Sequence, residues 1–387
     1  GSASGMRTSK ERILTTHVGS LPRPGDVAEL LAAKEFDKNY DTDTFETRMD
    51  SAVAESVTEQ RAIGLDVIND GEITKTGYAT YIQDRLSGFS GDSSSVLFDD
   101  LTDFPDYRHR MGQAARARRL RRPKCTGPVA LIDRAPILRD IARLRAGITE
   151  AGAGTAEAFM NAASPGVIAV FQDNEHYESD DAYVGALAAA MTEEYETIAG
   201  AGLVLQLDCP DLAMGRHVKF RDLSEDAFVR RAEQLVEALN VALANVPAEK
   251  VRMHVCWGNY EGPHHKDIGL ARIIDVVLGA KPQGLSFEAA NPRHAHEWQV
   301  FADIDLPDDK VLIPGVIDST TNYVEHPELV AERICRFANI VGRERVIASA
   351  DCGFATFAGI SKVDPEIARL KLEALVAGAE MASTQLW

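Results

Sequence analysis

The amino-acid sequence predicts an α/β protein in which parallel strands close into a (β/α)8 TIM barrel. Short apolar segments alternate with helix-length amphipathic segments along the chain, a pattern typical of parallel sheets covered by helices. Eight segments have the length and composition of buried strands, which is the number that a closed barrel requires. The chain also lacks the Gly-x-Gly-x-x-Gly fingerprint of an open nucleotide-binding sheet, so the closed form is favoured.

The expected strands recur at intervals along most of the chain. In order, they cover residues 13–20, 65–72, 125–131, 203–208, 251–256, 284–288, 311–318 and 346–351. Segments such as 225–244, 268–279 and 327–340 have the apolar spacing of surface helices and lie between strands. A ninth apolar run, 166–171, is assigned to the long connection after the third strand.

The chain is expected to form one domain, residues 6–387, preceded by an expression scar at 1–5. Two insertions interrupt the barrel pattern, 86–124 after the second strand and 132–165 after the third. The first insertion ends in an arginine-rich block, 108–124, which is unusual in an acidic protein. Two interpretations of this block remain open. In the first, the block forms a solvated helix face or a contact in a homo-oligomer. In the second, it forms a lid or wall that attracts an anionic substrate tail.

Charge and composition restrict the partners and the compartment. The formal net charge of −18 at pH 7 disfavours nucleic acid and anionic membranes as partners, because like charges repel. No apolar run approaches the roughly 20 residues that a membrane span requires, and no signal-peptide pattern is present. Five widely spaced cysteines do not suggest a disulfide framework, so a cytoplasmic protein with free thiols is expected.

A candidate metal site begins in the segment V-R-M-H-V-C-W-G-N-Y-E-G-P-H-H, which runs from an apolar strand into a loop. His254 and Cys256 lie two residues apart, so an extended strand points both side chains to one side. Glu288 and Cys352 follow later strands and add a carboxylate and a second thiol. This donor set suits Zn²⁺. The alternative is that the His and Cys of this pair are ordinary core residues.

Polar residues follow nearly every predicted strand. In a (β/α)8 barrel these positions lie at the C-terminal rim, where catalytic groups are found. Each acidic residue taken alone is more often a cap or loop residue, but the repetition at one rim favours an active site. Besides the metal-site residues, the rim candidates are His17, Ser20, Arg23, Asp70, Glu72, Asp208, Asp318 and Asp351.

Several segments together resemble the catalytic barrel of the cobalamin-independent methionine synthase family, a family of zinc enzymes. The segments that carry the resemblance are T-T-H-V-G-S-L-P-R, D-G-E, T-G-P-V, L-Q-L-D-C-P, M-H-V-C, F-E and D-C-G-F, in that order. Their combined order is specific, although each piece alone is not. The resemblance implies that the metal ligands are His254, Cys256, Glu288 and Cys352.

The resemblance also implies a binding site for an amino-acid thiol. Its family residues fall on Ser20, Glu72 and Asp208 in this chain. Arg23 is a further candidate for contact with the substrate. Two roles remain open for Trp257, which directly follows a metal ligand: packing in the core, or forming a wall of the substrate pocket.

Three departures from the family pattern concern the domain organisation and the alkyl donor. The chain resembles the short members, which have a single barrel. Thr320 stands where the family has a His that is thought to deliver a proton to the folate leaving group, and Cys209 stands in the middle of the D-x-P motif. The candidate proton donors of this chain are therefore His17, Tyr260, His264 and His265.

The sequence thus predicts zinc-dependent transfer of a methyl or other alkyl group to the thiolate of a small thiol. Glu72 and Asp208 suit the ammonium group of a homocysteine-type acceptor. The alkyl donor stays open between a methylfolate, a methylcobalamin donor and an epoxide. The loop W-G-N-Y-E-G-P-H-H also resembles epoxyalkane:coenzyme M transferase, so opening of an epoxide by a zinc-bound thiol is one alternative. A metal-free barrel like porphyrinogen decarboxylase is another.

Overall fold

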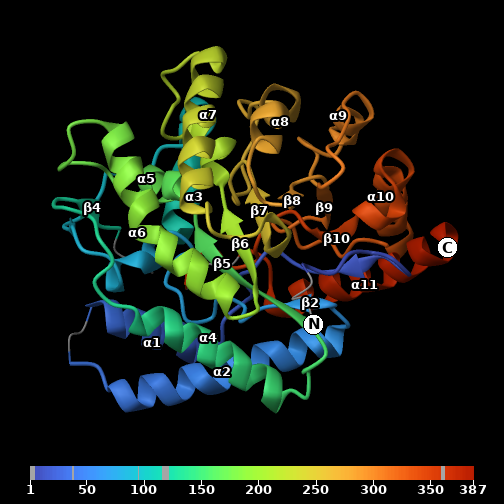
Figure 1. Ribbon diagram of the computed structural model, residues 1–387, viewed down its shortest axis with the longest axis horizontal. Coiled ribbons are helices and arrows are strands. Elements are labelled where there is room, and N and C mark those ends of the chain that lie inside the picture. The colour runs from blue at the N-terminus through green and yellow to red at the C-terminus, as the bar shows by residue number, and fades with distance from the viewer. Residues whose placement is uncertain (1–4, 37–38, 95, 116–121, 359–361) are drawn as a thin grey trace.

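Eight parallel strands form one sheet in the computed structural model, which describes residues 5–36, 39–94, 96–115, 122–358 and 362–387 (Figure 1). The strand order is β1-β10-β9-β8-β7-β6-β5-β2. These strands are β1 (Leu14–Thr15), β2 (Val67–Ile68), β5 (Glu157–Ala163), β6 (Val204–Asp208), β7 (Val251–Val255), β8 (Gly284–Phe287), β9 (Val311–Ile317) and β10 (Ile347–Ala350).

The sheet curves round until its two end strands meet. The backbone N–H of Asp66 donates to the carbonyl oxygen of Thr15 at 3.0 Å, and the hydroxyl of Thr16 donates to the carbonyl oxygen of Val67 at 3.1 Å. These bonds join the start of β2 to β1, while β1 pairs with β10 on its other side. The predicted (β/α)8 barrel is therefore confirmed.

Helices cover the outside of the barrel, and capping residues mark where several of them begin and end (Figure 1). The side chain of Asp41 accepts from the Thr44 N–H, and Gly64 ends the same helix with a φ of 103°. The α-helices of the described residues are α1 (Gly25–Phe36), α2 (Thr42–Ile63), α3 (Pro105–Ala115), α4 (Ala135–Glu150), α5 (Pro165–Phe171), α6 (Asp180–Gly200), α7 (Glu225–Ala242), α8 (Leu270–Leu278), α9 (Trp298–Ala302), α10 (Pro327–Val341) and α11 (Pro365–Leu386).

No helix within the described ranges combines the length and the apolar character that crossing a lipid bilayer requires.

The third barrel strand is β5, and the predicted strand at 125–131 was wrong. Its first residue ends β4 (Lys124–Cys125), which pairs antiparallel with β3 (Phe89–Ser90) in a separate small sheet. The Gly-Pro pair that follows stops the strand, because proline has no N–H for a ladder. Both predicted insertions consequently begin before β5, in the connection from β2, and the second one contains α4 and β5 itself.

The apolar run at 166–171, which we assigned to a connection, lies within helix α5. Ser164 caps this helix by accepting a hydrogen bond from the Val167 N–H at 3.1 Å. Pro165 occupies the first turn, where its missing N–H has no cost.

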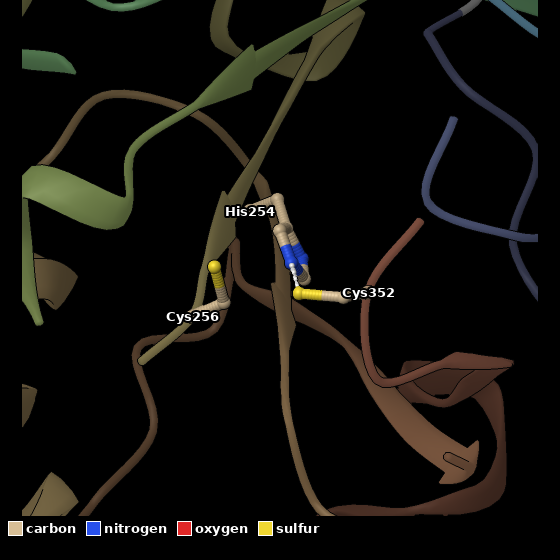
Figure 2. Close-up of side chains that lie close together, drawn as sticks. All are labelled: His254, Cys256 and Cys352. Atoms are coloured by element: carbon tan, nitrogen blue, oxygen red, sulfur yellow. Dashed lines mark hydrogen bonds between the residues drawn. The ribbon is translucent and has the colours of Figure 1, made fainter. Parts of the chain in front are cut away.

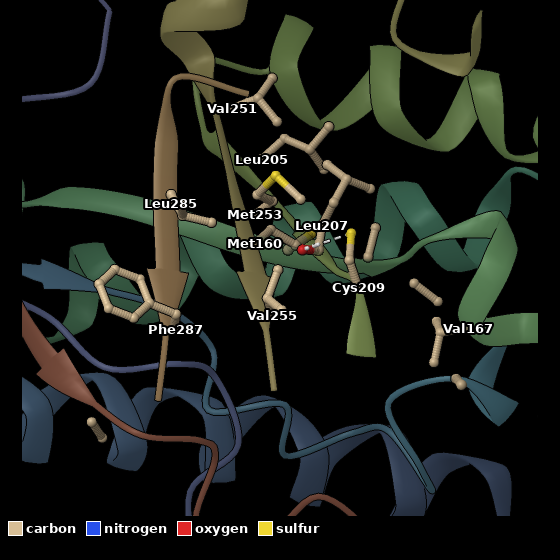
Figure 3. Close-up of a cluster of buried hydrophobic side chains, with 14 of the residues drawn as sticks. Met160, Val167, Leu205, Leu207, Cys209, Val251, Met253, Val255, Leu285 and Phe287 are labelled. Carbon is tan, nitrogen blue, oxygen red and sulfur yellow. Dashed lines mark hydrogen bonds between the residues drawn. The ribbon is translucent and has the colours of Figure 1, made fainter. Parts of the chain in front are cut away.

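Alternation along each strand separates an outer apolar layer from the barrel interior. Figure 3 shows part of the outer layer, including Leu205, Leu207, Met253 and Leu285, all of which are almost completely buried. The floor of the interior is also apolar. It consists of Met6, Val67, Phe159, Val204, Val311, Ile313 and Ile347.

A polar layer lies inside the barrel on top of this floor. The guanidinium of Arg252 lies 3.7 Å above the ring of Phe159. It donates to the Gln206 side-chain oxygen at 2.7 Å, to the Thr16 hydroxyl at 3.0 Å and to the His17 carbonyl at 2.6 Å. A buried charge is tolerated where its donors are satisfied in this way.

We predict that Arg252→Ala lowers the free energy of unfolding by about 3 kcal/mol, because it leaves a cavity and removes the donors of buried acceptors. Urea denaturation measures the change. Arg272, whose side chain is 47% exposed in a surface ion pair, is the control, and Arg272→Ala is expected to cost about 1 kcal/mol or less. Equal losses for the two variants would contradict this role of Arg252.

Candidate metal centre and active site

The C-terminal ends of three neighbouring strands bring polar side chains side by side. Asp208 on β6 pairs in register with His254 on β7, which pairs with Ser286 on β8. Residues in register on parallel strands point to the same face of the sheet. Glu288 follows Ser286 by two residues and Cys256 follows His254 by two, so the same alternation carries both onto the inner rim.

Three of the four predicted metal ligands converge at this rim. Ligand atoms of His254, Cys256 and Cys352 all lie within 4.8 Å of one another, and all three side chains are buried. The Nε2 atom of His254 lies 3.4 Å from the Sγ atom of Cys352. Figure 2 shows the imidazole and this thiol facing each other, with Cys256 beside them at the end of β7.

The fourth predicted ligand, Glu288, lies at the edge of this group. Its Oε1 atom is 3.6 Å from the Sγ atom of Cys352, and its Oε2 atom accepts the backbone N–H of Trp257 at 3.3 Å. The carboxylate is thus held next to the two thiols and the imidazole.

Ser286 sets the orientation of the imidazole. Its hydroxyl lies 2.7 Å from Nδ1 of His254. When Nδ1 carries the ring proton and donates to this hydroxyl, the lone pair of Nε2 points toward Cys352, as a metal ligand requires. Ser286 was not among the predicted site residues, although its position two residues before Glu288 places it on the same face.

Asp351 holds two of the ligand-bearing loops together. Its carboxylate accepts the backbone N–H groups of Ala289, Ala290 and Asn291 at 2.8–3.0 Å, and also the Asn291 side-chain amide. Asp351 directly precedes Cys352, and the three N–H groups directly follow Glu288. The sequence indicated Asp351 as a rim residue, and the structure shows which backbone it fixes.

The electrostatics of the cluster favour a bound cation. The hydrogen bond from Cys352 lowers the pKa of Cys256 well below its usual range. Burial raises the pKa of Cys352 and that of Glu288 well above their usual ranges. All three groups are therefore ionised together only when a nearby positive charge compensates them. Two thiolates, one imidazole and one carboxylate fit a borderline-soft divalent ion.

Two buried carboxylates from the predicted substrate site interact with each other. Burial raises the pKa of Glu72 to about 8, and the nearby negative charge of Asp208 adds to this shift. The ammonium of Lys75 lies 3.9 Å from Oε1 of Glu72, and its positive charge opposes this rise in the pKa of Glu72. Asp208 accepts the Gln206 side-chain amide at 2.9 Å, and burial raises its pKa as well. Glu72 has a φ of 51°, a left-handed conformation that few non-glycine residues adopt.

Ser20 and Arg23 tie loops of the rim together. The Oγ atom of Ser20 accepts the Ala355 N–H at 3.1 Å, and a Cβ atom at Gly353 would lie only 2.1 Å from that Oγ atom. The guanidinium of Arg23 donates to backbone carbonyls on both sides of the rim at 2.8–3.2 Å. These acceptors are Glu72, Ile73, Lys75 and Ala355.

The structure places Trp257 in the core. The side chain is fully buried, its indole N–H donates to the Ile268 carbonyl at 2.7 Å, and its ring stacks on His294 at a centroid distance of 3.7 Å. Of the two roles left open by the sequence, core packing agrees with these contacts.

The predicted proton donors occupy separate environments. Burial lowers the pKa of His17 to about 4, and its Nε2 atom lies 2.8 Å from the side-chain oxygen of Gln60. The phenol of Tyr260 donates to Asp100 at 2.8 Å.

Each of the two adjacent histidines has a ring nitrogen in contact with a carboxylate. His264 has Nδ1 3.0 Å from Asp267 and Nε2 2.9 Å from the Tyr260 carbonyl. His265 is exposed, and its Nε2 atom contacts Asp103 at 2.9 Å.

The arginine-rich block at 108–124 begins inside helix α3, where Arg108 and Arg110 are exposed. Residues 116–121 of the block lie outside the described residues.

Fold and site together define a (β/α)8 barrel with a candidate metal centre of two thiols, one imidazole and one carboxylate at its C-terminal mouth. The family model "Cobalamin-independent synthase, catalytic domain" matches residues 13–102 and 169–379. The chain belongs to this family, and is an enzyme of the methionine synthase type of methyltransferase. The unmatched stretch, 103–168, includes α3, α4 and β5.

Two relatives and one solved structure illustrate the similarity. The methionine synthase of Saccharolobus solfataricus is 25% identical over 375 residues, which are 96% of this chain and 95% of the relative. The 5-methyltetrahydropteroyltriglutamate–homocysteine methyltransferase of Nitratidesulfovibrio vulgaris is 26% identical over 359 residues, covering 88% of this chain but 39% of that protein. A B12-independent methionine synthase from a Shewanella species, in complex with selenomethionine, has the same fold, with a TM-score of 0.70 at 19% identity. That alignment covers 97% of this chain and 99% of the other.

We predict that Ser286→Ala lowers the affinity for a divalent metal ion by roughly 10-fold or more, because the imidazole of His254 loses the group that orients it. Competition with a chromophoric chelator measures the affinity. Ser349→Ala is the matched control, since the hydroxyl of Ser349 is buried without a hydrogen-bond partner among the described residues. The same loss in both variants would refute a specific role for Ser286.

Proposed function

We propose that this enzyme transfers a methyl group to the thiolate of homocysteine or a close analogue, with Zn²⁺ held by His254, Cys256, Glu288 and Cys352. The observation that supports the proposal most strongly is the convergence of two thiols and an imidazole from two strand ends within 4.8 Å, next to the Glu288 carboxylate. Bound Zn²⁺ would lower the pKa of an incoming thiol, so that the thiolate form is available at neutral pH.

The ligand charges suit this chemistry. Two thiolates and one carboxylate more than neutralise a divalent ion, so a substrate thiolate near it would keep its nucleophilic character. The backbone N–H of Trp257 holds one oxygen of Glu288 and leaves the other facing Cys352. We assign Trp257 to this positioning role.

The acceptor is selected, in this proposal, by Glu72 and Asp208. Two buried carboxylates match the ammonium group of an amino-acid thiol and oppose a sulfonate such as that of coenzyme M. Ser20 and Arg23 keep the surrounding loops in place, since their polar atoms contact backbone groups. An amino-acid thiol is therefore favoured over coenzyme M as the acceptor.

His17 is neutral in this scheme and does not act as the proton donor to the leaving group. The Gln60 oxygen accepts the Asn69 N–H, so it is an acceptor toward His17 as well, and the ring proton of His17 resides on Nε2. Because burial lowers its pKa to about 4, the ring is neutral at pH 7 and Nδ1 carries a lone pair. Tyr260 and His264 are assigned to support the loop after β7, because their polar atoms are bound to Asp100 and Asp267.

The proposal also includes the partners, the domain organisation and the compartment of the enzyme. The partners are a small thiol and a methyl donor, either a methylfolate or a methylcobalamin donor. Residues 6–387 act as one domain. All five cysteines are free thiols, which agrees with a reducing cytoplasm.

The function is tested by supplying zinc-loaded enzyme with homocysteine or coenzyme M, each paired in turn with methyltetrahydrofolate, methylcobalamin or a small epoxide. Mass spectrometry follows thioether formation. We expect methionine from homocysteine and a methyl donor, and Cys352→Ser should lower the rate by roughly 100-fold or more. Cys335→Ser on α10 is the control and should retain activity. A thioether formed only from coenzyme M and an epoxide would refute the proposal.

The pKa of Glu72 predicts how acceptor binding depends on pH. Glu72 is neutral below about pH 8 and binds an ammonium group best when ionised, so affinity should rise as the pH increases toward about 8. Methionine is the suitable probe, because it has the same ammonium group but no titrating thiol, and calorimetry measures its binding between pH 6 and 8.5. Glu72→Gln should remove the rise. A rise that persists in this variant would show that another group controls it.

A further inference from the structure

A second group of metal-type donors lies beneath the loop that follows β7. Ligand atoms of His217, His264 and Asp267 are all within 4.8 Å of one another. His217 ends the short 3-10 helix Met214–His217, whereas the other two belong to the segment between β7 and α8. None of these residues belongs to the four-ligand centre described above.

His217 is the member of this group whose polar atoms are left without partners. Only 1% of its side chain is exposed, and Nδ1 lies 3.7 Å from Oδ1 of Asp267, too far for a hydrogen bond. Neither ring nitrogen makes a close hydrogen bond to the described residues, and a backbone polar group of Trp257 interacts with the ring in a way that opposes the lowering of the His217 pKa by burial. A buried polar group without a partner costs about 1–3 kcal/mol, so this imidazole is expected to bind a group that the protein chain does not supply.

His264 is oriented toward the same point by its backbone and by its second nitrogen. Its φ of 53° is a left-handed conformation, and its backbone N–H donates to Asp100 at 2.9 Å. The Nε2 atom lies 2.9 Å from the Tyr260 carbonyl, while Nδ1 faces Asp267. A histidine ligand of a metal ion characteristically donates its other ring N–H to a carbonyl in this manner.

Asp267 is also supported from outside the group. Its Oδ2 atom lies 2.7 Å from Nε2 of His294, whose other nitrogen contacts Glu297. The Oδ1 atom faces both His217 and His264, and Oδ2 also lies 3.0 Å from Nδ1 of His264. One buried carboxylate with a positioned hydrogen-bond partner completes a donor set of two imidazoles and one carboxylate.

A further buried oxygen without a partner borders the group. Asp100 is fully buried, and its Oδ2 atom accepts the Tyr260 hydroxyl and the His264 N–H, while Oδ1 has no hydrogen-bond partner among the described residues. An oxygen in this position is placed to accept a hydrogen bond from a water molecule that is bound to an ion.

We propose that His217, His264 and Asp267 form a second site for a divalent transition-metal ion, separate from the thiol-containing centre. Two nitrogen ligands and one oxygen ligand suit Zn²⁺ and its neighbours in the first transition series. The ion holds the loop between β7 and α8 in place. This effect extends to Trp257, because His294 contacts Asp267 and stacks on the ring of Trp257.

The competing description is a metal-free network of ion pairs. Burial alone would lower the pKa of His264 and His294, but their hydrogen bonds to Asp267 raise it, for His294 to about 9. In this description the ring of His294 is protonated, and Asp267 is the shared partner of both histidines. This arrangement leaves both nitrogens of His217 and one oxygen of Asp100 unsatisfied, which the bound ion resolves.

Metal content separates the two descriptions. The whole protein is equilibrated with Zn²⁺, freed of excess ion by gel filtration and analysed by inductively coupled plasma mass spectrometry. We expect about two ions per chain for the wild type and about one each for His217→Asn and Cys352→Ser. His296→Asn, an exposed histidine two residues beyond His294, is the control and should retain about two. One ion in the wild type that survives in His217→Asn would overturn the proposal.

Cobalt substitution identifies which site each variant has lost. Thiolate-to-cobalt charge transfer can come only from the centre that contains cysteine. It should persist in His217→Asn and disappear in Cys352→Ser, while the weaker visible bands of nitrogen- and oxygen-bound cobalt remain in Cys352→Ser. Loss of every cobalt band in Cys352→Ser would overturn the second site and leave the thiol-containing centre intact. If His217→Asn does not fold, as judged by circular dichroism, the Cys352→Ser spectrum decides alone.

Discussion

The register of three parallel strands is the constraint on which the site depends. Asp208, His254 and Ser286 lie side by side in register on β6, β7 and β8. The carboxylate proposed to bind the substrate, a candidate metal ligand and the hydroxyl next to that ligand therefore share one inner face. A shift of one residue in any of these strands would turn its polar group outward into the apolar layer beneath the helices. The buried guanidinium of Arg252 one layer below supports this arrangement, because it links β7 to Gln206 on β6.

A second constraint is the mutual repulsion of the groups gathered at the rim. Cys256, Cys352 and Glu288 are buried together, and Glu72 lies close enough to Asp208 for each charge to oppose the other. Folding alone therefore produces a mouth that favours positive charge: a divalent ion at the thiols and an ammonium group at the carboxylates. The specificity of the proposed reaction and its metal dependence arise from the same electrostatic cause.

The parts of this structure that could be predicted from sequence are those governed by local rules. Alternation with a period of two placed His254 and Cys256 together, and strand-to-loop boundaries located Cys352, which the structure brings to the same point. The third strand, β5, was missed because E-A-F-M-N-A-A is poor in β-branched residues and becomes a strand through burial between β2 and β6. The role of Asp351 required knowledge of which backbone N–H groups lie opposite it, and this depends on tertiary packing alone.

Trp257 connects the two groups of metal-type donors through a short and rigid path. Its backbone N–H holds Glu288, its ring stacks on His294, and His294 contacts Asp267. Each of these contacts is buried, so a displacement of the loop at one end cannot be absorbed by solvent along the way. The position of the Glu288 carboxylate relative to the thiols is therefore fixed from below by the histidine and aspartate group, and not only by strand β8.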